Sequence, residues 1–175
     1  MSDKAPLRVL DLGECRASLE KRADGSLIVR NLAPLDPYPH SLTERLDHWA
    51  KMAPHRVWLA ERDADGGWRK VAYGEARTIV RRIAASLLAR NLSAERPVAI
   101  LSGNSIDHAL LGMAAMYAGV AYAPISPAYS LISSDHGKLK YIFELLTPGL
   151  IYAEDGKPFA RAILNAAPAD AEIVI

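Results

Sequence analysis

The side chains that could do chemistry in this sequence are few and scattered. The chain has one cysteine, Cys15, and no histidine lies near it in the sequence, so a catalytic thiolate is not expected. The five histidines lack the spacing of metal ligands. His48 and His55, for example, are separated by Pro54 and therefore do not share a helix. We predict no catalytic residue and no metal site within this chain.

The sequence also lacks the known phosphate-binding loop motifs. Neither G-x-x-x-x-G-K-[ST] nor G-x-G-x-x-G occurs, the segment Gly103-Asn104-Ser105 is too short to count, and the nucleophile pattern G-x-S-x-G is absent. One side of a predicted helix carries three basic residues that could contact phosphate, Arg77, Arg81 and Arg82. Isolated arginines on an outer helical face are ordinary, so we interpret them as a solvated surface.

Composition describes a folded protein with one domain, or one domain and a small appendage. The 175 residues are 50% hydrophobic, and a formal net charge of +1 provides no field for nucleic acid or an anionic membrane. The single cysteine excludes an internal disulfide and fits a reducing compartment, and the N-terminus lacks the apolar core of a secretory signal. We predict a soluble, cytoplasmic protein.

One uncharged stretch tests that prediction. Ala109 to Ser134 contains no charged side chain and is long enough to span a bilayer. Gly119, Pro124 and Pro127 interrupt it. A buried helix followed by a buried strand explains the stretch better than a membrane span.

The elements that would position functional groups fall into two parts. Residues 1–40 are predicted to form a strand pair, over Leu7–Leu12 and Ser26–Arg30, followed by a proline-rich extended connector. Residues 41–175 are predicted to form an incomplete α/β subdomain. It begins with a helix whose Ser41–Glu44 segment has the capping-box pattern and which Pro54 ends.

The remaining elements are predicted to build a doubly wound, mostly parallel sheet, because short apolar strands alternate with single helices. The first of these elements are a hairpin, over residues 57–62 and 68–71, and a helix, over residues 74–90. Strands are predicted over 98–101, 120–123, 150–153 and 172–175, and helices over 106–118, from Ser133 or Ser134 to Leu146, and over 157–165.

The chain stops on Ile173-Val174-Ile175, without a closing helix or polar tail. An open parallel sheet normally covers its edges, so we expect this chain to be part of a larger enzyme and its exposed edge to promote self-association. A complete small α/β binding or partner domain of flavodoxin-like shape, without enzymatic activity, is the alternative.

Two segments resemble the core motifs of adenylate-forming enzymes. Val71–Ala76 is similar to Leu-Thr-Tyr-x-Glu-Leu, and Tyr117–Tyr129 is similar to Lys-Ala-Gly-x-x-Tyr-x-Pro-Leu-Asp-Pro-x-Tyr. Residues 26–31, 64–68 and 124–140 look most like the feruloyl-CoA synthase group of acyl-CoA synthetases. The resemblance covers nearly the whole chain and implies the N-terminal part of an AMP-binding acyl-CoA synthetase.

Four residues depart from those motifs. Ala72 replaces a threonine or serine that would cap the following helix, at a cost of about 1 kcal/mol. Ala76 replaces leucine, Tyr117 replaces lysine, and Ser126 replaces an acidic residue. None of these positions is catalytic in the family, so the departures bear on the subgroup.

The resemblance implies a two-step reaction with ATP, CoA and Mg²⁺. An aromatic or acyl carboxylate would attack ATP to give an acyl-adenylate and pyrophosphate, and the CoA thiolate would then displace AMP. The phosphate loop and the catalytic lysine of the family lie downstream of Ile175. The chain alone is therefore expected to be inactive and to bind none of these cofactors tightly.

The resemblance also implies one binding site within the chain. In some acyl-CoA synthetases, basic residues of the matching helix contact the 3′-phosphate of CoA, and Lys157 and Arg161 lie four apart on one helical face. A solvated surface pair is the interpretation we favour. For Tyr122 and Tyr129, an aromatic wall near the acyl pocket is conceivable, but core packing is the expected role.

Overall fold

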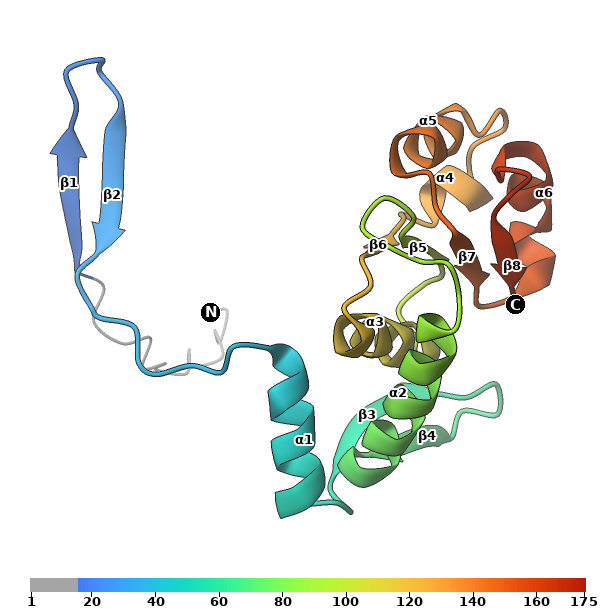
Figure 1. Ribbon diagram of the computed structural model, residues 1–175, viewed down its shortest axis with the longest axis horizontal. Coiled ribbons are helices and arrows are strands. Elements are labelled where there is room, and N and C mark those ends of the chain that lie inside the picture. The colour runs from blue at the N-terminus through green and yellow to red at the C-terminus, as the bar shows by residue number, and fades with distance from the viewer. Residues whose placement is uncertain (1–15) are drawn as a thin grey trace, which may run out of the picture. The chain divides into compact units, whose positions relative to one another are not determined.

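The structure is a computed structural model that describes residues 16–175. The chain divides into two compact units, Met1–Tyr38 and Pro39–Ile175. The first contains one antiparallel strand pair, and the second contains an α/β fold (Figure 1). Each unit is described below by itself.

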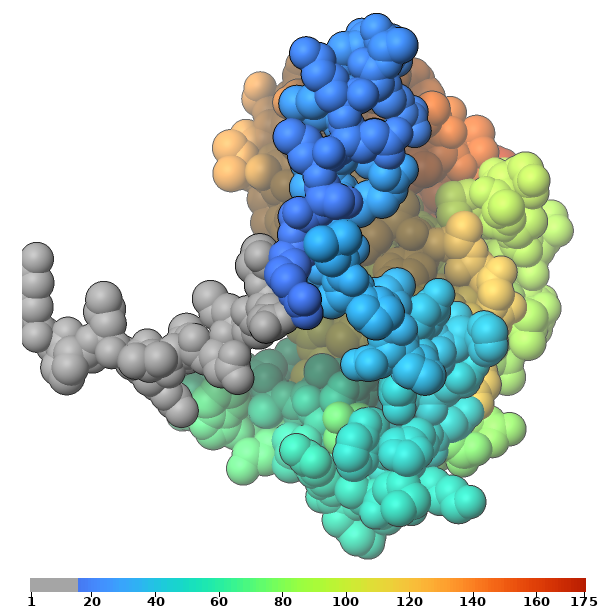
Figure 2. Space-filling model, turned by 90° about the vertical axis from the view of Figure 1, so that its left-hand side faces the viewer, coloured from blue at the N-terminus to red at the C-terminus, as the bar shows by residue number. Residues whose placement is uncertain are grey.

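The first unit is a two-stranded hairpin. Strand β1 (Ala17–Lys21) pairs antiparallel with β2 (Leu27–Asn31), and Gly25 takes a left-handed φ of 85° in the turn between them. Leu19 faces Val29 across the pair, and both side chains are exposed. Figure 2 shows the surface of this hairpin in blue. The predicted strand at residues 7–12 lies outside the described residues. The partner of β2 is Ala17–Lys21, a segment whose pairing the sequence analysis did not predict.

The second unit begins with helix α1 (Leu42–Met52). The Ser41 hydroxyl accepts a hydrogen bond from the Glu44 amide at 3.4 Å, as the capping pattern predicts. Strands β3 (Val57–Arg62) and β4 (Trp68–Ala72) form the predicted hairpin, and helix α2 (Tyr73–Leu88) follows β4 directly.

A four-stranded parallel sheet forms the centre of the second unit, with the order β6-β5-β7-β8. This arrangement confirms the predicted α/β class with a doubly wound sheet. Its elements are β5 (Val98–Leu101), α3 (Ile106–Ala118), β6 (Tyr122–Pro124), α4 (Ala128–Leu131), α5 (Gly137–Leu146), β7 (Leu150–Ala153), α6 (Gly156–Ala166) and β8 (Glu172–Val174).

Two apolar cores lie on opposite faces of this sheet. Val98 and Ile100 of β5 point toward α2 and α3, while Ala99 and Leu101 point toward α5 and α6. All four residues are fully buried, which is why β5 is an uninterrupted apolar run rather than an alternating one. Helices therefore lie on both sides of the sheet (Figure 1).

The segment between β6 and α5 differs from its prediction. A short helix, α4, precedes α5, and α5 begins at Gly137 rather than directly after Ser133 or Ser134. The Ser133 hydroxyl accepts from the His136 amide, and His136 has a left-handed φ of 55° with a buried side chain. Because of this turn, α5 begins later than predicted. The hydrophobic periodicity of the sequence does not indicate the turn.

The start of β6 also differs. The sequence predicts a strand from Val120, but β6 begins at Tyr122. Gly119 adopts a left-handed φ of 70°, and the Val120 amide donates to the Ala115 carbonyl, so both residues complete the end of α3.

The uncharged stretch from Ala109 to Ser134 is divided among α3, β6 and α4. Across residues 16–175, no helix combines the length and the apolar character that crossing a bilayer requires.

Helix α2 begins without a side-chain cap, because Ala72 stands at its N-cap in an extended conformation with φ −81° and ψ 160°. Ala72→Ser should therefore raise the free energy of unfolding by about 1 kcal/mol, since the hydroxyl can accept from a free amide of the first turn. Urea denaturation measures the change. The matched control is Ala85→Ser on the exposed side of the same helix, where serine should cost about 0.5 kcal/mol. Equal effects at the two positions would contradict the capping explanation.

Candidate functional site

The strand order creates a switch point at the carboxyl edge of the sheet. From β5 the chain passes through α3 to β6 on one side, and from β7 it passes through α6 to β8 on the other. In open α/β sheets, ligands bind outside the carboxyl ends of the strands where such connections diverge. The loop after β5 and the loop after β7 are therefore the first candidates for a functional site.

Three residues fix the loop after β5. The Ser102 hydroxyl is buried, lies 2.8 Å from Nδ1 of His108 and donates to the Gly103 carbonyl at 2.9 Å. Nδ1 of His108 also lies 3.0 Å from that carbonyl. Because a carbonyl only accepts, this geometry favours a proton on Nδ1. His108 is thus oriented rather than free to rotate.

The start of α3 is held by an ion cluster. Arg69 of β4 donates to both carboxylate oxygens of Asp107 at 2.8 Å and to Glu61 of β3 at 2.9 Å. The second Glu61 oxygen accepts from the Ile106 amide at 2.8 Å. These bonds attach the β3–β4 hairpin to the first turn of α3, beside the switch point.

Electrostatics at this cluster fix the protonation of two side chains. Hydrogen bonding from Arg69 holds the pKa of Asp107 below its ordinary value despite partial burial. Burial, with the nearby Asp107 and Glu154 carboxylates, raises the pKa of Tyr152 to about 12. At neutral pH Asp107 is therefore ionised, and Tyr152 keeps its proton and can donate it in a hydrogen bond.

The two basic residues predicted for CoA lie on α6, which starts at the same edge. Asp155 caps the helix by accepting from the Lys157 amide at 3.0 Å. Both basic side chains are exposed, and Nη2 of Arg161 donates to the Ser134 carbonyl at 3.2 Å. Two exposed cations one turn apart match a phosphate group in charge, and this assignment remains a prediction.

Tyr122 and Tyr129 both make packing contacts. The Tyr122 ring lies against Gly112, where an added Cβ would come within 3.2 Å of it. Tyr129 packs at the edge of the core beside α5 and α6, and its ring lies 5.3 Å from the Lys138 ammonium. These contacts are those expected of core aromatic residues.

The basic face of α2 is only partly solvated, which corrects one interpretation. Arg77 donates through Nε to Asp47 of α1, and the Tyr117 hydroxyl donates to the other Asp47 oxygen at 2.8 Å. Burial opposes ionisation, yet these bonds keep the pKa of Asp47 below its ordinary value. Tyr117, which stands where the family motif has lysine, therefore ties α3 to α1, while Arg81 and Arg82 are exposed.

Sequence reasoning missed the cluster of Glu61, Arg69 and Asp107 and the pair of Ser102 and His108. The Arg69 and Asp107 partners are 38 residues apart, so no local pattern indicates their contact. Within residues 16–175, no group of three or more histidine, cysteine or acidic side chains is arranged to hold a metal ion.

Comparison with known proteins gives one family. Residues 46–174 match the profile described as "AMP-binding enzyme". A component of the plipastatin synthase of Bacillus subtilis (strain 168) is 36% identical over 99 residues, covering 57% of this chain and 4% of that protein. A protein of Salinispora arenicola (strain CNS-205) described as "Probable non-canonical nonribosomal peptide synthetase" is 30% identical over 105 residues, covering 60% of this chain and 1% of the other.

Solved structures share the fold. The fatty acyl-adenylate ligase from L. pneumophila, crystallised with acyl adenylate and pyrophosphate, superposes with a TM-score of 0.61 at 18% identity. That match covers 77% of this chain and 23% of the ligase. The present chain therefore spans a small part of the length of the proteins that it matches.

The Arg69–Asp107 pair should make stability depend on pH. Because the folded-state pKa of Asp107 is lowered, its contribution is present above the unfolded value of about 3.9 and is lost as pH falls through the folded value. Asp107→Asn should thus lower the free energy of unfolding at pH 7 by up to about 1 kcal/mol, with a smaller loss at pH 3. Urea titrations at both pH values measure this difference.

Asp65→Asn, in the exposed β3–β4 turn, is the control for removing one surface carboxylate. A loss for Asp107→Asn that is the same at pH 7 and pH 3 would contradict the ionic explanation.

Proposed function

Because the chain belongs to the AMP-binding enzyme family, we propose that it is the N-terminal part of an ATP-dependent ligase that joins a carboxylic acid to CoA. In the first step a carboxylate oxygen attacks the α-phosphorus of ATP and pyrophosphate leaves. In the second step the CoA thiolate attacks the acyl carbon and AMP leaves. ATP, Mg²⁺ and CoA are the cofactors of this proposed reaction.

The observation that carries the proposal is the placement of the two motifs. Val71–Ala76 crosses the junction of β4 and α2, and Tyr117–Tyr129 runs from the end of α3 through β6 into α4. Both lie within the residues that match the family profile. Gly119 of the second motif has the left-handed conformation that ends α3, so its place in the pattern has a physical reason.

An aromatic acid such as ferulate is the proposed substrate. The support is the resemblance of residues 26–31, 64–68 and 124–140 to the feruloyl-CoA synthase group. The residues that define the acyl pocket in this family lie mostly further along the chain than Ile175. For the same reason the 175-residue chain alone is proposed to be inactive, acting as scaffold for groups supplied by a longer polypeptide.

A second candidate differs only in the acceptor. The S. arenicola relative is a nonribosomal peptide synthetase, which favours an adenylating domain that transfers its acyl group to a carrier-protein thiol. Both candidates share the acyl-adenylate. They differ in the thiol that accepts the acyl group, which is free CoA in the first candidate and a carrier-protein thiol in the second. A self-contained α/β binding domain without activity is the third alternative, since fold alone permits it.

The function is tested with the longest polypeptide that the reading frame encodes. Ferulate-dependent exchange of pyrophosphate into ATP, followed by feruloyl-CoA formation when CoA is added, is the expected result. Exchange that is not followed by acyl-CoA formation when CoA is added would support the second candidate. Full exchange activity in the 175-residue chain itself would contradict the proposed role of scaffold.

We also propose that Lys157 and Arg161 contact the 3′-phosphate of CoA. Arg161→Ala in that same polypeptide tests this contact. Loss of one charged phosphate contact should raise the KM for CoA about tenfold and leave the KM for ATP unchanged. Lys157→Ala should have the same selectivity. Lys51→Ala, which removes an exposed lysine of α1, is the matched control. An unchanged KM for CoA in both α6 variants would show that the basic pair is only solvated surface.

A further inference from the structure

The turn at residues 133–137, between α4 and α5, is closed by its own hydrogen bonds. The Ser133 hydroxyl accepts from the His136 amide and donates to a carboxylate oxygen of Asp135, both at 3.0 Å. The same Asp135 oxygen accepts from the Gly137 amide at 3.1 Å. The bonds from the Gly137 amide and the Ser133 hydroxyl hold the pKa of Asp135 below its ordinary value. The Asp135 carboxylate is therefore ionised at neutral pH and already bonded within this segment, which we call the α4–α5 turn.

Helix α6 lies beside α4 and α5 (Figure 1), and two of its side chains bond to the α4–α5 turn. Nη2 of Arg161 donates to the Ser134 carbonyl at 3.2 Å. Nδ2 of Asn165 lies 3.3 Å from the Asp135 carbonyl and 2.9 Å from Nδ1 of His136. Because Arg161 and Asn165 are four residues apart, they share one face of α6. The turn is thus attached to this face at neighbouring points.

The side-chain amide of Asn165 donates twice in this arrangement. A carbonyl oxygen only accepts, so the Asn165 atom beside the Asp135 carbonyl is its amide nitrogen. That nitrogen has a second proton to donate to Nδ1 of His136, which therefore carries no proton itself. The His136 side chain is 1% exposed. Asn165 thus connects the surface of α6 to a buried ring that anchors the turn.

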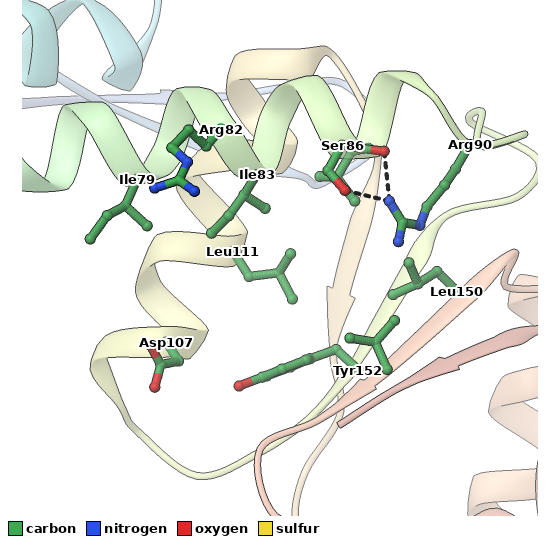
Figure 3. A pocket seen from close by; sticks show the side chains of 11 residues that line it. Ile79, Arg82, Ile83, Ser86, Arg90, Asp107, Leu111, Leu150 and Tyr152 are labelled. Carbon is green, nitrogen blue, oxygen red and sulfur yellow. Dashed lines mark hydrogen bonds between the residues drawn. The ribbon is translucent and has the colours of Figure 1, made fainter.

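The charge of Arg161 is not compensated in the way that other arginines of the second unit are. Arg90, for example, donates to Ser86 (Figure 3) and to both carboxylate oxygens of Glu172. Arg161 donates to a neutral carbonyl, and no carboxylate among residues 16–175 forms an ion pair with it. Its positive charge and its other N–H groups are therefore available to an anion such as phosphate.

A side chain that is held before its ligand arrives binds that ligand more tightly. A free arginine loses rotamer freedom when a phosphate immobilises it, and this loss weakens the affinity. Arg161 has lost part of that freedom already, because the Ser134 carbonyl holds its Nη2 group. The Ser134 carbonyl is itself held, because Asn165 bonds to the carbonyl of the next residue, Asp135.

We propose that Asn165 is a positioning residue for the 3′-phosphate of CoA and acts through Arg161. Its two hydrogen bonds keep the α4–α5 turn against α6, and the Ser134 carbonyl then holds the Arg161 guanidinium ready to donate to the phosphate beside Lys157. This proposal rests on the proposed function, in which CoA is the thiol substrate and Lys157 and Arg161 contact its phosphate.

A double-mutant cycle in the longest polypeptide that the reading frame encodes tests this role. Asn165→Leu removes both donors at similar volume and should raise the KM for CoA about fivefold, while kcat and the KM for ATP stay unchanged. In an Arg161→Ala background the same substitution should add nothing to the KM, because Asn165 acts through Arg161. Asn165 is exposed, so the variant is expected to fold. Asn91→Leu, at an exposed asparagine between α2 and β5, is the matched control and should change no constant.

NMR of the 175-residue chain measures the positioning without CoA. The nitrogen chemical shift of His136 Nδ1 is expected to be that of an unprotonated nitrogen that accepts a hydrogen bond, and Asn165→Leu should change it. Relaxation of the Arg161 Nε–H group should show a more mobile guanidinium in Asn165→Leu than in the unsubstituted chain.

Three results would overturn the positioning role alone. The first is an unchanged KM for CoA in Asn165→Leu while Arg161→Ala raises it. The second is an equal effect of Asn165→Leu with and without Arg161, which would show that Asn165 acts through other parts of α6. The third is an Arg161 guanidinium that is equally mobile in both chains. Failure of the proposed function is distinct, because either no acyl-CoA forms or Arg161→Ala leaves the KM for CoA unchanged. Either outcome would overturn the positioning role as well.

Discussion

The burial of β5 on both faces is the constraint on which the second unit depends. Val98 to Leu101 are all fully buried, so this strand needs a packed layer above and below it. Its backbone groups pair with β6 on one side and with β7 on the other. The helices on both sides, the switch point between β5 and β7, and the loop that contains Ser102 all follow from its central position. A polar side chain at any of these four positions would be buried without a hydrogen-bond partner, which is costly in an apolar interior.

Most elements of the second unit could be predicted because the residues within each element determine its type and its ends. The bounds of β3, β5, β7 and α3 agree with their predictions, since each has an apolar run or stripe and clear end signals. Ser105 caps α3 through its hydroxyl, directly before the predicted helix start at residue 106. Failures occurred where the backbone leaves ordinary regions, at His136, or where a strand lacks a strong apolar pattern, as in Ala17–Lys21.

The candidate site was less predictable because its groups meet only through the fold. Lys157 and Arg161 share a helical turn and could be paired from spacing alone. By contrast, Arg69 and Asp107 meet because the β3–β4 hairpin lies against the first turn of α3, and a single sequence carries no trace of that contact. The motif of Tyr117 to Tyr129 gave the family without showing that Tyr117 itself binds Asp47. Motif recognition and side-chain geometry are thus separate kinds of information.

The contact between Gly112 and the Tyr122 ring constrains how this sequence can vary. Gly112 lies inside α3, where glycine weakens a helix, and an added Cβ would lie 3.2 Å from the Tyr122 ring, so the ring would have to shift by a few tenths of an ångström. A side chain larger than a methyl group at position 112 would need either a larger displacement of the Tyr122 ring or a smaller residue at 122. Natural variants of this segment should therefore change the two positions as a pair, exchanging a small residue for a ring in opposite directions.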